Sequence, residues 1–150
     1  MLKRRRCLLA DLIEIIGDAS DVTIAEAENA GLNPWTLLKS LWQARKGGES
    51  WAVFDDDEVL FCIGHYPCPL RPKVRILWMV AKQGWFERGA AGVFYGRRFM
   101  KELCARFPGS RFESSSWSRH PDLLRWFALQ GFTHTGYGHG STVFEIAKKG

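Results

Sequence analysis

The stretch that decides the fold is Trp117-Ser118-Arg119-His120-Pro121-Asp122-Leu123-Leu124-Arg125-Trp126-Phe127-Ala128-Leu129-Gln130-Gly131-Phe132. Pro121 suits the first turn of a helix because proline has no backbone N–H and its φ is already helical. Gly131 suits the position just past a helix end. The sequence therefore predicts a short amphipathic helix, followed by an extended segment from Thr133 to Ala147. The apolar residues of this predicted helix recur at helical spacing: Leu123, Trp126, Phe127 and Leu129.

This order of strand, short helix, Gly-Phe and final strand resembles the C-terminal end of the GCN5-related N-acetyltransferase (GNAT) superfamily. There an Asn opens the short helix, a Tyr lies four residues before the Gly, and Gly-Phe closes it. His120 stands at the Asn position and Phe127 at the Tyr position. In that superfamily the Tyr often serves as general acid to the departing thiolate, which requires an ionisable hydroxyl. Phe127 has none, so the resemblance implies the fold without this acid.

A second resemblance, over most of the chain, is to the GNAT-like internal virion (core) proteins of short-tailed bacteriophages. Residues 24–34 are similar to that family's early Glu-Ala, Ala-Gly and Pro helix end. Leu77-Trp78-Met79-Val80 is similar to its Trp-bearing central strand, and Arg125-Trp126 to its Arg-aromatic pair. The order of these motifs, the spacing between them and the length of the chain all match that family. Leu123 and His120 depart from it, because the family often has polar residues there.

The remaining pattern predicts a single GNAT-like domain over residues 1–150, a size that supports one core. Its fold class is α+β, with a mostly antiparallel mixed sheet flanked by helices. We expect a hairpin around the acidic turn Asp55-Asp56-Asp57 and a central strand over Val74–Val80. The other expected elements are a strand and short helix within 7–16, helices over 22–30 (capped by Asp21), 34–46 and 90–107, a loop over 83–89 and a strand over 111–117.

Charge and cysteine usage narrow the class of protein. The net charge is +5, yet no nucleic-acid-binding motif accompanies it, so a basic protein with solvated charges is favoured. Four scattered cysteines favour a reducing compartment. The apolar run 8–16 is too short for a bilayer and is interrupted by Asp11 and Glu14, and no signal peptide is visible, so we expect a soluble protein.

The segment before the long helix, Arg88-Gly89-Ala90-Ala91-Gly92-Val93, is the candidate cofactor loop. In working acetyltransferases this loop carries a Gln or Arg, two further residues, and then Gly-x-Gly or Gly-x-Ala. The glycines let backbone N–H groups approach the pyrophosphate closely. Here Ala91 holds the first Gly position, so Arg88, Gly89, Ala91 and Gly92 form at most a degenerate anion site. A loop and helix start with small residues for close packing is favoured.

Two surfaces are candidates for contact with a partner. Arg97, Arg98 and Lys101 form a basic stripe on the long helix, which is either a solvated face or a contact with an acidic partner or DNA phosphates. The loop containing Pro67, Pro69 and Arg71 is stiffened by its prolines and offers a rigid shape.

No residue is assigned to metal binding or catalysis. Cys62, His65 and Cys68 provide three ligands where zinc sites usually need four. The acidic turn suits solvent as well as a cation. His120, His134 and His139 lack a nucleophile and a supporting acid at telling spacing.

These observations favour a bacteriophage virion structural or assembly protein, catalytically inactive and acting through protein–protein contacts with other virion proteins. On this hypothesis it uses no cofactor, makes no membrane contact, and resides in the virion and, during assembly, in the host cytoplasm. The alternative is an acetyl-CoA-dependent N-acyltransferase with a degenerate cofactor loop. A fold does not fix a function, so the site must decide.

Overall fold

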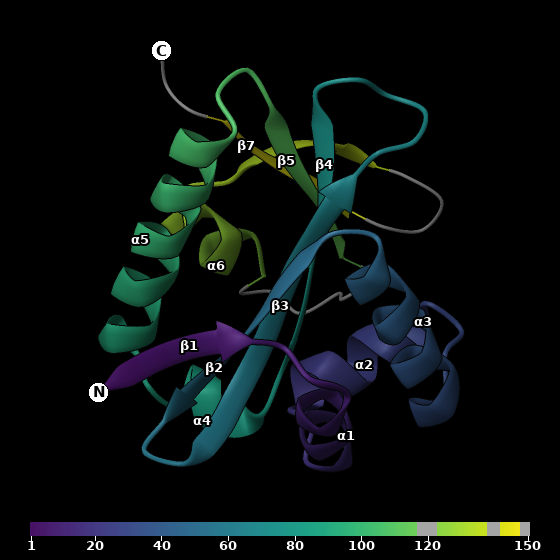
Figure 1. Ribbon diagram of the computed structural model, residues 1–150, viewed down its shortest axis with the longest axis vertical. Helices are drawn as coiled ribbons and strands as arrows, with labels where there is room; N and C mark the ends of the chain where they lie inside the picture. The colour runs from purple at the N-terminus through teal and green to yellow at the C-terminus, as the bar shows by residue number, and fades with distance from the viewer. Residues whose placement is uncertain (117–122, 138–141, 148–150) are drawn as a thin grey trace.

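A computed structural model describes residues 1–116, 123–137 and 142–147. Within these residues seven strands form one sheet in the order β1-β2-β3-β4-β5-β7-β6 (Figure 1). Only β4 and β5 pair in parallel; the other neighbours are antiparallel. In chain order the elements are β1 (Leu2–Arg6), α1 (Leu9–Gly17), α2 (Asp21–Asn29), α3 (Pro34–Lys46), β2 (Glu49–Asp55), β3 (Glu58–Pro67), β4 (Val74–Ala81), α4 (Gln83–Phe86), α5 (Ala90–Arg106), β5 (Arg111–Ser116), α6 (Leu123–Leu129), β6 (Thr133–Tyr137) and β7 (Thr142–Ala147).

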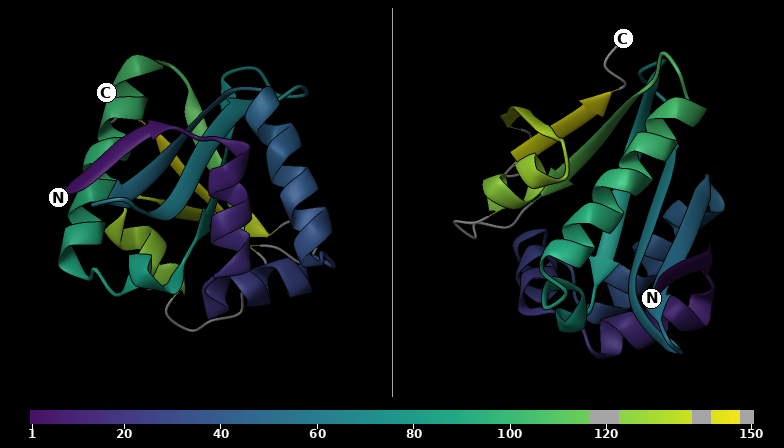
Figure 2. Two further views of the ribbon diagram at one scale, coloured as in Figure 1. Left: turned by 60° about the horizontal axis from the view of Figure 1, so that its bottom comes forward. Right: turned by 90° about the vertical axis from the view of Figure 1, so that its left-hand side faces the viewer.

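Helices cover both faces of the sheet, and each face has its own core (Figure 2). On one face, α5 and α6 pack on a core that is rich in phenylalanine; on the other, α1 and α3 pack on smaller aliphatic residues. The fold class predicted from the sequence is thus confirmed. The first core includes Leu77, Phe99, Leu103, Phe112, Phe127 and Phe144. The second includes Leu12, Ile15, Leu41, Ala52, Cys62 and Val80.

Several predicted elements are confirmed because local signals agree with the packing. α3 begins at Pro34 after Asn33, whose side chain accepts a hydrogen bond from the Thr36 N–H at 2.9 Å. The acidic turn joins β2 to β3, with Asp56 at a φ of 51°. The predicted central strand is β4, the fourth of the seven strands in the sheet. None of the helices in the described part of the chain is long and apolar enough to cross a membrane.

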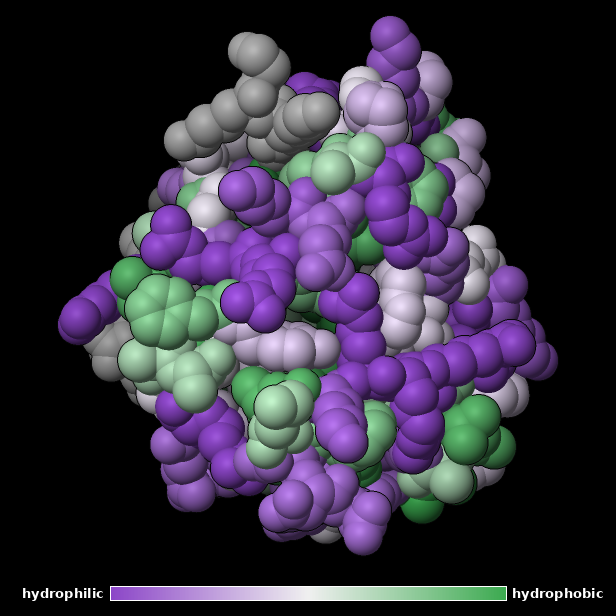
Figure 3. Space-filling model, turned by 60° about the vertical axis from the view of Figure 1, so that its left-hand side comes forward, coloured by the Kyte–Doolittle hydropathy of each residue, from purple (hydrophilic) through white to green (hydrophobic). Residues whose placement is uncertain are grey.

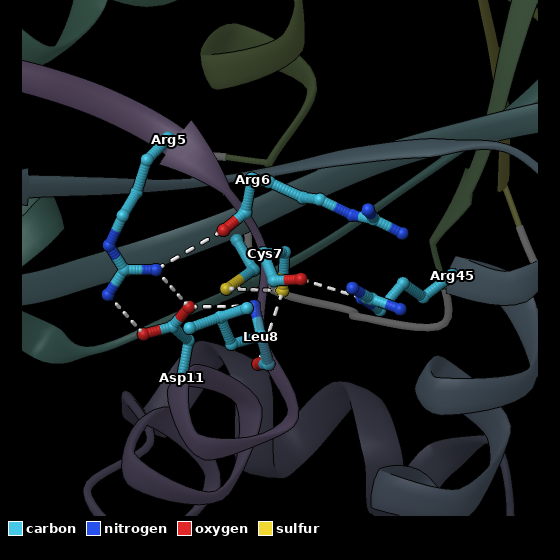
Figure 4. Close-up of polar contacts among 7 residues, drawn as sticks. Arg5, Arg6, Cys7, Leu8, Asp11 and Arg45 are labelled. Atoms are coloured by element: carbon cyan, nitrogen blue, oxygen red, sulfur yellow. Dashed lines mark hydrogen bonds and ion pairs between the residues drawn. The ribbon is translucent and has the colours of Figure 1, made fainter.

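The strand expected within residues 7–16 lies earlier, because the basic run itself is β1. This is an edge strand, so its cationic side chains reach solvent and acidic partners. Arg5 donates two hydrogen bonds to Asp11, at 2.6 and 2.8 Å, and Leu8 N–H donates to the same carboxylate at 2.8 Å (Figure 4). The Arg5 guanidinium and the Leu8 N–H hold the pKa of Asp11 below its usual range, against the effect of burial.

Contacts with β3 and α3 also hold the turn from β1 into α1 in place. The Cys7 and Cys62 sulfurs lie 3.3 Å apart as buried free thiols, and Arg45 Nε donates to the Cys7 carbonyl at 2.6 Å (Figure 4). These contacts, together with the Arg5–Asp11 pair, bring α1 and α3 against the same face of β3.

Three further predictions are corrected. The expected loop 83–89 contains the short helix α4, whose Trp85 is buried against Phe61. The extended segment 133–147 is a hairpin, β6 and β7, rather than one final strand. The N-cap of α2 is Ser20, which accepts from the Thr23 N–H at 3.1 Å, and not Asp21.

The aromatic side chains are divided between core and surface. Phe127 is buried, whereas Trp78 and Trp126 are only partly buried. Trp35, in the first turn of α3, is 72% exposed.

His65 on β3 is completely buried on the aromatic face of the sheet. Its ring stacks on Trp51 and meets Phe107 and Phe112 edge-on. Arg75 Nε donates to its Nδ1 at 2.8 Å, and Nε2 lies 3.3 Å from a Glu49 oxygen. Burial, and then the Arg75 charge, lower the pKa of His65 to about 4, so the ring is neutral in the folded protein at pH 7.

This depressed pKa makes a testable prediction about stability. An unfolded histidine titrates near pH 6.5, so between pH 6.5 and 4 the unfolded chain binds the extra proton and the folded protein loses stability as the pH falls. We expect the free energy of unfolding to drop by about 2 kcal/mol between pH 7 and pH 5 in urea titrations. His65→Asn, which keeps an acceptor for Arg75 but does not titrate, should lose most of this drop. An equal drop in both proteins contradicts the prediction.

Candidate active site

The pairing between β4 and β5 ends early. Their register comprises three pairs, Val74 with Arg111, Arg75 with Phe112 and Ile76 with Glu113. Beyond these, β4 continues alongside β3, and β5 continues alongside β7. The sheet therefore opens between its two halves, as the view along its edge shows (Figure 2, right).

One end of the opened edge of β4 is satisfied by the start of α2. Ser20 N–H and Thr23 Oγ1 donate to the Ala81 carbonyl at 3.0 and 3.1 Å. Backbone groups of a strand point alternately to its two edges, so Leu77 and Met79 present their N–H and C=O groups on the same edge as Ala81. The Leu77 N–H belongs to the last bridge, between Ile76 and Glu113, whereas the Leu77 C=O and both backbone groups of Met79 lie within the opening and can hydrogen-bond to an extended ligand.

A cavity of about 550 Å³ occupies the opening and reaches both faces of the sheet. On one face it lies under α2 and α3, and we call this part the helical lobe. On the other it reaches α4, α6 and β5, and we call this part the aromatic lobe. The helical lobe is lined by Thr23, Glu26, Ala27, Ala30, Leu32, Leu37, Ser40, Leu41, Ala44, Tyr66, Ile76, Trp78, Val80 and Ser115. The aromatic lobe is lined by Phe86, Ser114, Trp126 and Phe127.

The indole of Trp78 forms the sheet side of the helical lobe. It lies over Gly64, the residue that pairs with it on β3. A Cβ at Gly64 would come within 2.4 Å of the ring carbon Cζ2, so only glycine admits this position of the indole. Trp78 Nε1 is buried and has no hydrogen-bond partner in the described part of the chain.

Ring stacking fixes the aromatic lobe. Phe127 stacks parallel on Phe144 with centroids 3.8 Å apart, and Trp126 meets Phe86 edge-on. Ser114 on β5 brings a buried hydroxyl to the same lobe. The Tyr position of the GNAT pattern is therefore occupied by a core phenyl ring.

The predicted cofactor loop lies just after α4, whose Phe86 lines the aromatic lobe. Arg88 is engaged within the chain: it donates to Asp55 at 2.7 Å, and the N-terminal ammonium binds the same carboxylate at 2.8 Å. Gly89 is the N-cap of α5 with a φ of 55°, which favours glycine. Ala91 is exposed, while Gly92 packs against Trp85.

The first turn of α5 has backbone N–H donors without partners in the helix. Its N-cap provides no side-chain hydrogen bond, so the N–H groups of Ala90, Ala91 and Gly92 have no partner within the helix. Together with the helix dipole these donors favour negative charge. Whether Arg88, Gly89, Ala91 and Gly92 bind a cofactor stays a prediction.

The partner-binding candidates lie away from the cavity. Arg97, Arg98 and Lys101 are exposed on α5, and the face that carries this helix is largely hydrophilic with separate hydrophobic patches (Figure 3). Contact through this stripe stays a prediction. In the loop, Pro67 and Pro69 are exposed. Arg71 makes a bidentate pair with Glu113 at 2.8 Å, so its guanidinium is already engaged.

The metal and histidine candidates give no site in the described residues. There, no three His, Cys, Asp or Glu side chains gather to hold a metal ion. His134 is exposed, with its ring nitrogen 3.0 Å from the Gly136 carbonyl. His120 and His139 lie outside the described residues.

Sequence reasoning missed the helical lobe. The signal that could have found it is the spacing of small residues. Ala27 and Ala30 are three apart near the end of α2, and Ser40 and Ala44 are four apart on α3. Each pair shares a helix face and leaves room beside it. The sequence did not show that these two faces meet over Trp78.

Solved structures share this fold at low sequence identity. The GNAT domain of PAT from S. lividans matches with a TM-score of 0.73 and 12% identity, over 97% of this chain and 89% of that one. Aminoglycoside acetyltransferase AAC(6')-Ib, in complex with coenzyme A, matches at 0.69 and 13%, over 99% and 96%. Ribosomal-protein-S5-alanine acetyltransferase from Vibrio fischeri matches at 0.66 and 12%, over 99% and 93%. Neither a family model nor a curated protein sequence matches the chain. The chain has the GNAT fold.

The hypothesis of a bacteriophage virion protein is wrong. The three similar structures are acetyltransferases or an acetyltransferase domain, and none of them is a virion protein. The hypothesis relied on the resemblance to phage core proteins, on Phe127 and on the loop at Arg88, where Ala91 holds the first Gly position of the pattern. Neither departure from the GNAT pattern closes the opening between β4 and β5, so the cleft is present despite both of them.

The close approach of Gly64 and Trp78 makes a prediction about the cavity floor. Gly64→Ala should displace the indole and destabilise the protein by about 1–3 kcal/mol through overpacking, as measured by urea unfolding. Gly84→Ala is the matched control, because its Cβ would meet only Leu60 at 3.6 Å and alanine favours α4. Equal stability of the two variants would show that the indole has room to move.

Proposed function

We propose that this protein is an N-acyltransferase that transfers the acetyl group of acetyl-CoA to an amine. The observation that carries the proposal is the cavity that passes the open edge of β4 from one face of the sheet to the other. A thioester can enter through the aromatic lobe and an amine through the helical lobe. Their reacting atoms then meet beside β4.

The chain offers three kinds of contact for acetyl-CoA. Met79 presents its backbone N–H and C=O groups, and Leu77 its C=O group, to the amide-bearing arm. The aromatic lobe supplies apolar surface for the thioester end. The first turn of α5 supplies N–H donors for the phosphates without any need for Arg88. A shared fold with a coenzyme A complex supports this assignment, which remains our proposal.

The reaction needs modest help from the protein. The amine lone pair attacks the thioester carbonyl carbon, a C–N bond forms and the C–S bond breaks. The nitrogen loses a proton, and the departing thiolate gains one. A backbone N–H of β4 that points into the opening can stabilise the negative carbonyl oxygen of the intermediate. Glu26 is the carboxylate among the described lining residues, and it can receive the amine proton directly or through water.

Phe127 does not prevent this chemistry. Alkyl thiols have pKa values of about 8.5, so a thiolate leaves from a thioester near neutral pH without a strong acid beside it. The Ser114 hydroxyl in the aromatic lobe can donate a hydrogen bond to the sulfur as it departs.

Acetyl-CoA binding tests the proposal. We expect acetyl-CoA to bind saturably in calorimetry and to raise the melting temperature. Ala91→Asp places a carboxylate at the first turn of α5, which favours the helix but repels the phosphates, so affinity should fall at least tenfold.

Ala25→Asp is the matched control, since Ala25 is exposed on α2 and does not line the cavity. It should bind acetyl-CoA as the parent does. No binding by the parent protein overturns the proposal, and equal affinity of both variants removes the start of α5 from the phosphate site.

A further inference from the structure

On the proposed function, the thioester end of acetyl-CoA lies at the closed end of the opening beside β4. The N–H donors for the phosphates are in the first turn of α5, which follows the C-terminal end of β4 in the chain. From there the amide-bearing arm runs back past Met79 and the Leu77 carbonyl to Ile76, the last residue of β4 that pairs with β5. The acetyl carbonyl carbon is therefore near Ile76, and the acceptor must bring its nitrogen to the same place.

Tyr66 lines the helical lobe at this closed end. It pairs with Ile76 between β3 and β4, and residues directly opposite each other carry their side chains on the same face of the sheet. Both residues line the cavity. The base of the Tyr66 ring lies beside Gly47 at the end of α3, where an added Cβ would come within 3.6 Å of the Tyr66 Cβ. Strand pairing and the end of α3 therefore hold this tyrosine next to the expected position of the acetyl group.

The hydroxyl of Tyr66 is available to a ligand. In the described residues, the buried polar side-chain atoms without a hydrogen-bond partner are His65 Nε2 and Trp78 Nε1. The Tyr66 oxygen also makes no hydrogen bond there, so it is accessible and not enclosed. Burial of the side chain raises the pKa of Tyr66, so the hydroxyl keeps its proton at pH 7. A neutral hydroxyl can accept a hydrogen bond from an N–H group.

We propose that the Tyr66 hydroxyl binds the nitrogen of the acceptor and directs its lone pair at the thioester carbonyl carbon. This proposal rests on the proposed function and assigns a further residue to the same site. The hydroxyl oxygen accepts a hydrogen bond from one N–H of the neutral amine, and this orientation accelerates the attack. The C–N bond forms and the C–S bond breaks. The proton that the nitrogen loses passes to water, and Tyr66 keeps its own.

Hydroxylamine is the acceptor used in the test, because it is a small amine that is mostly uncharged at pH 7 and does not require a pocket for a larger body. With saturating acetyl-CoA, acetohydroxamate is measured as its coloured iron(III) complex, and the uncatalysed rate is subtracted. Tyr66→Phe removes only the oxygen and keeps the ring. It should lower kcat/KM for hydroxylamine at least fivefold, the loss of about one hydrogen bond, with unchanged acetyl-CoA affinity and melting temperature.

Tyr95→Phe is the matched control, since Tyr95 is half-buried on α5 and does not line the cavity. It should react with hydroxylamine as the parent does. If acetyl-CoA does not bind to the parent, the proposed function fails. If acetyl-CoA binds, the role of Tyr66 is overturned by any of three results: a parent that does not accelerate the reaction, a Tyr66→Phe variant as fast as the parent, or an equal loss of acetyl-CoA affinity in that variant.

Discussion

The early end of the pairing between β4 and β5 is the constraint on which the rest of the molecule depends. After Ile76 the two strands belong to different halves of the sheet, each held by its antiparallel neighbour. Unpaired backbone groups inside a protein must find partners or face solvent. α2 supplies partners at Ala81 through Ser20 and Thr23, and the stretch before Ala81 stays open beside the cavity.

The two halves stay together because each face has its own core. On the aromatic face, Phe127 and Phe144 stack α6 onto β7, and Trp126 reaches back to Phe86 in α4. On the other face, the turn at Cys7 and the Arg45 contact hold α1 and α3 against the sheet. The packing on the two faces of the sheet therefore holds its two halves together on either side of the opening. The cavity lies between these two cores.

The loss of familiar residues is weaker evidence against catalysis than the loss of a cleft. Phe127 lacks the hydroxyl of the GNAT pattern, but a thioester has a good leaving group and needs little acid. Arg88 is engaged with Asp55, but backbone N–H groups at a helix start do not depend on a side chain. The hypothesis of an inactive protein relied on these two positions. The cavity depends instead on where β4 separates from β5 and on the small side chains of α2 and α3.

Local signals in the sequence determined most of the helices and strands. Proline and asparagine at the start of α3, the acidic turn after β2 and the apolar run of β4 act between neighbouring residues, so their outcome is readable without the fold. The C-terminal pattern also indicated the GNAT fold. Tertiary structure alone decided that the basic run 3–6 is an edge strand, because it pairs with β2 and because the carboxylate that Arg4 contacts, Glu102, is 98 residues away in the sequence. It alone decided the site as well: Glu26, Tyr66 and Ser114 are distant in sequence, and only the divergence of β4 from β5 places them around one cavity.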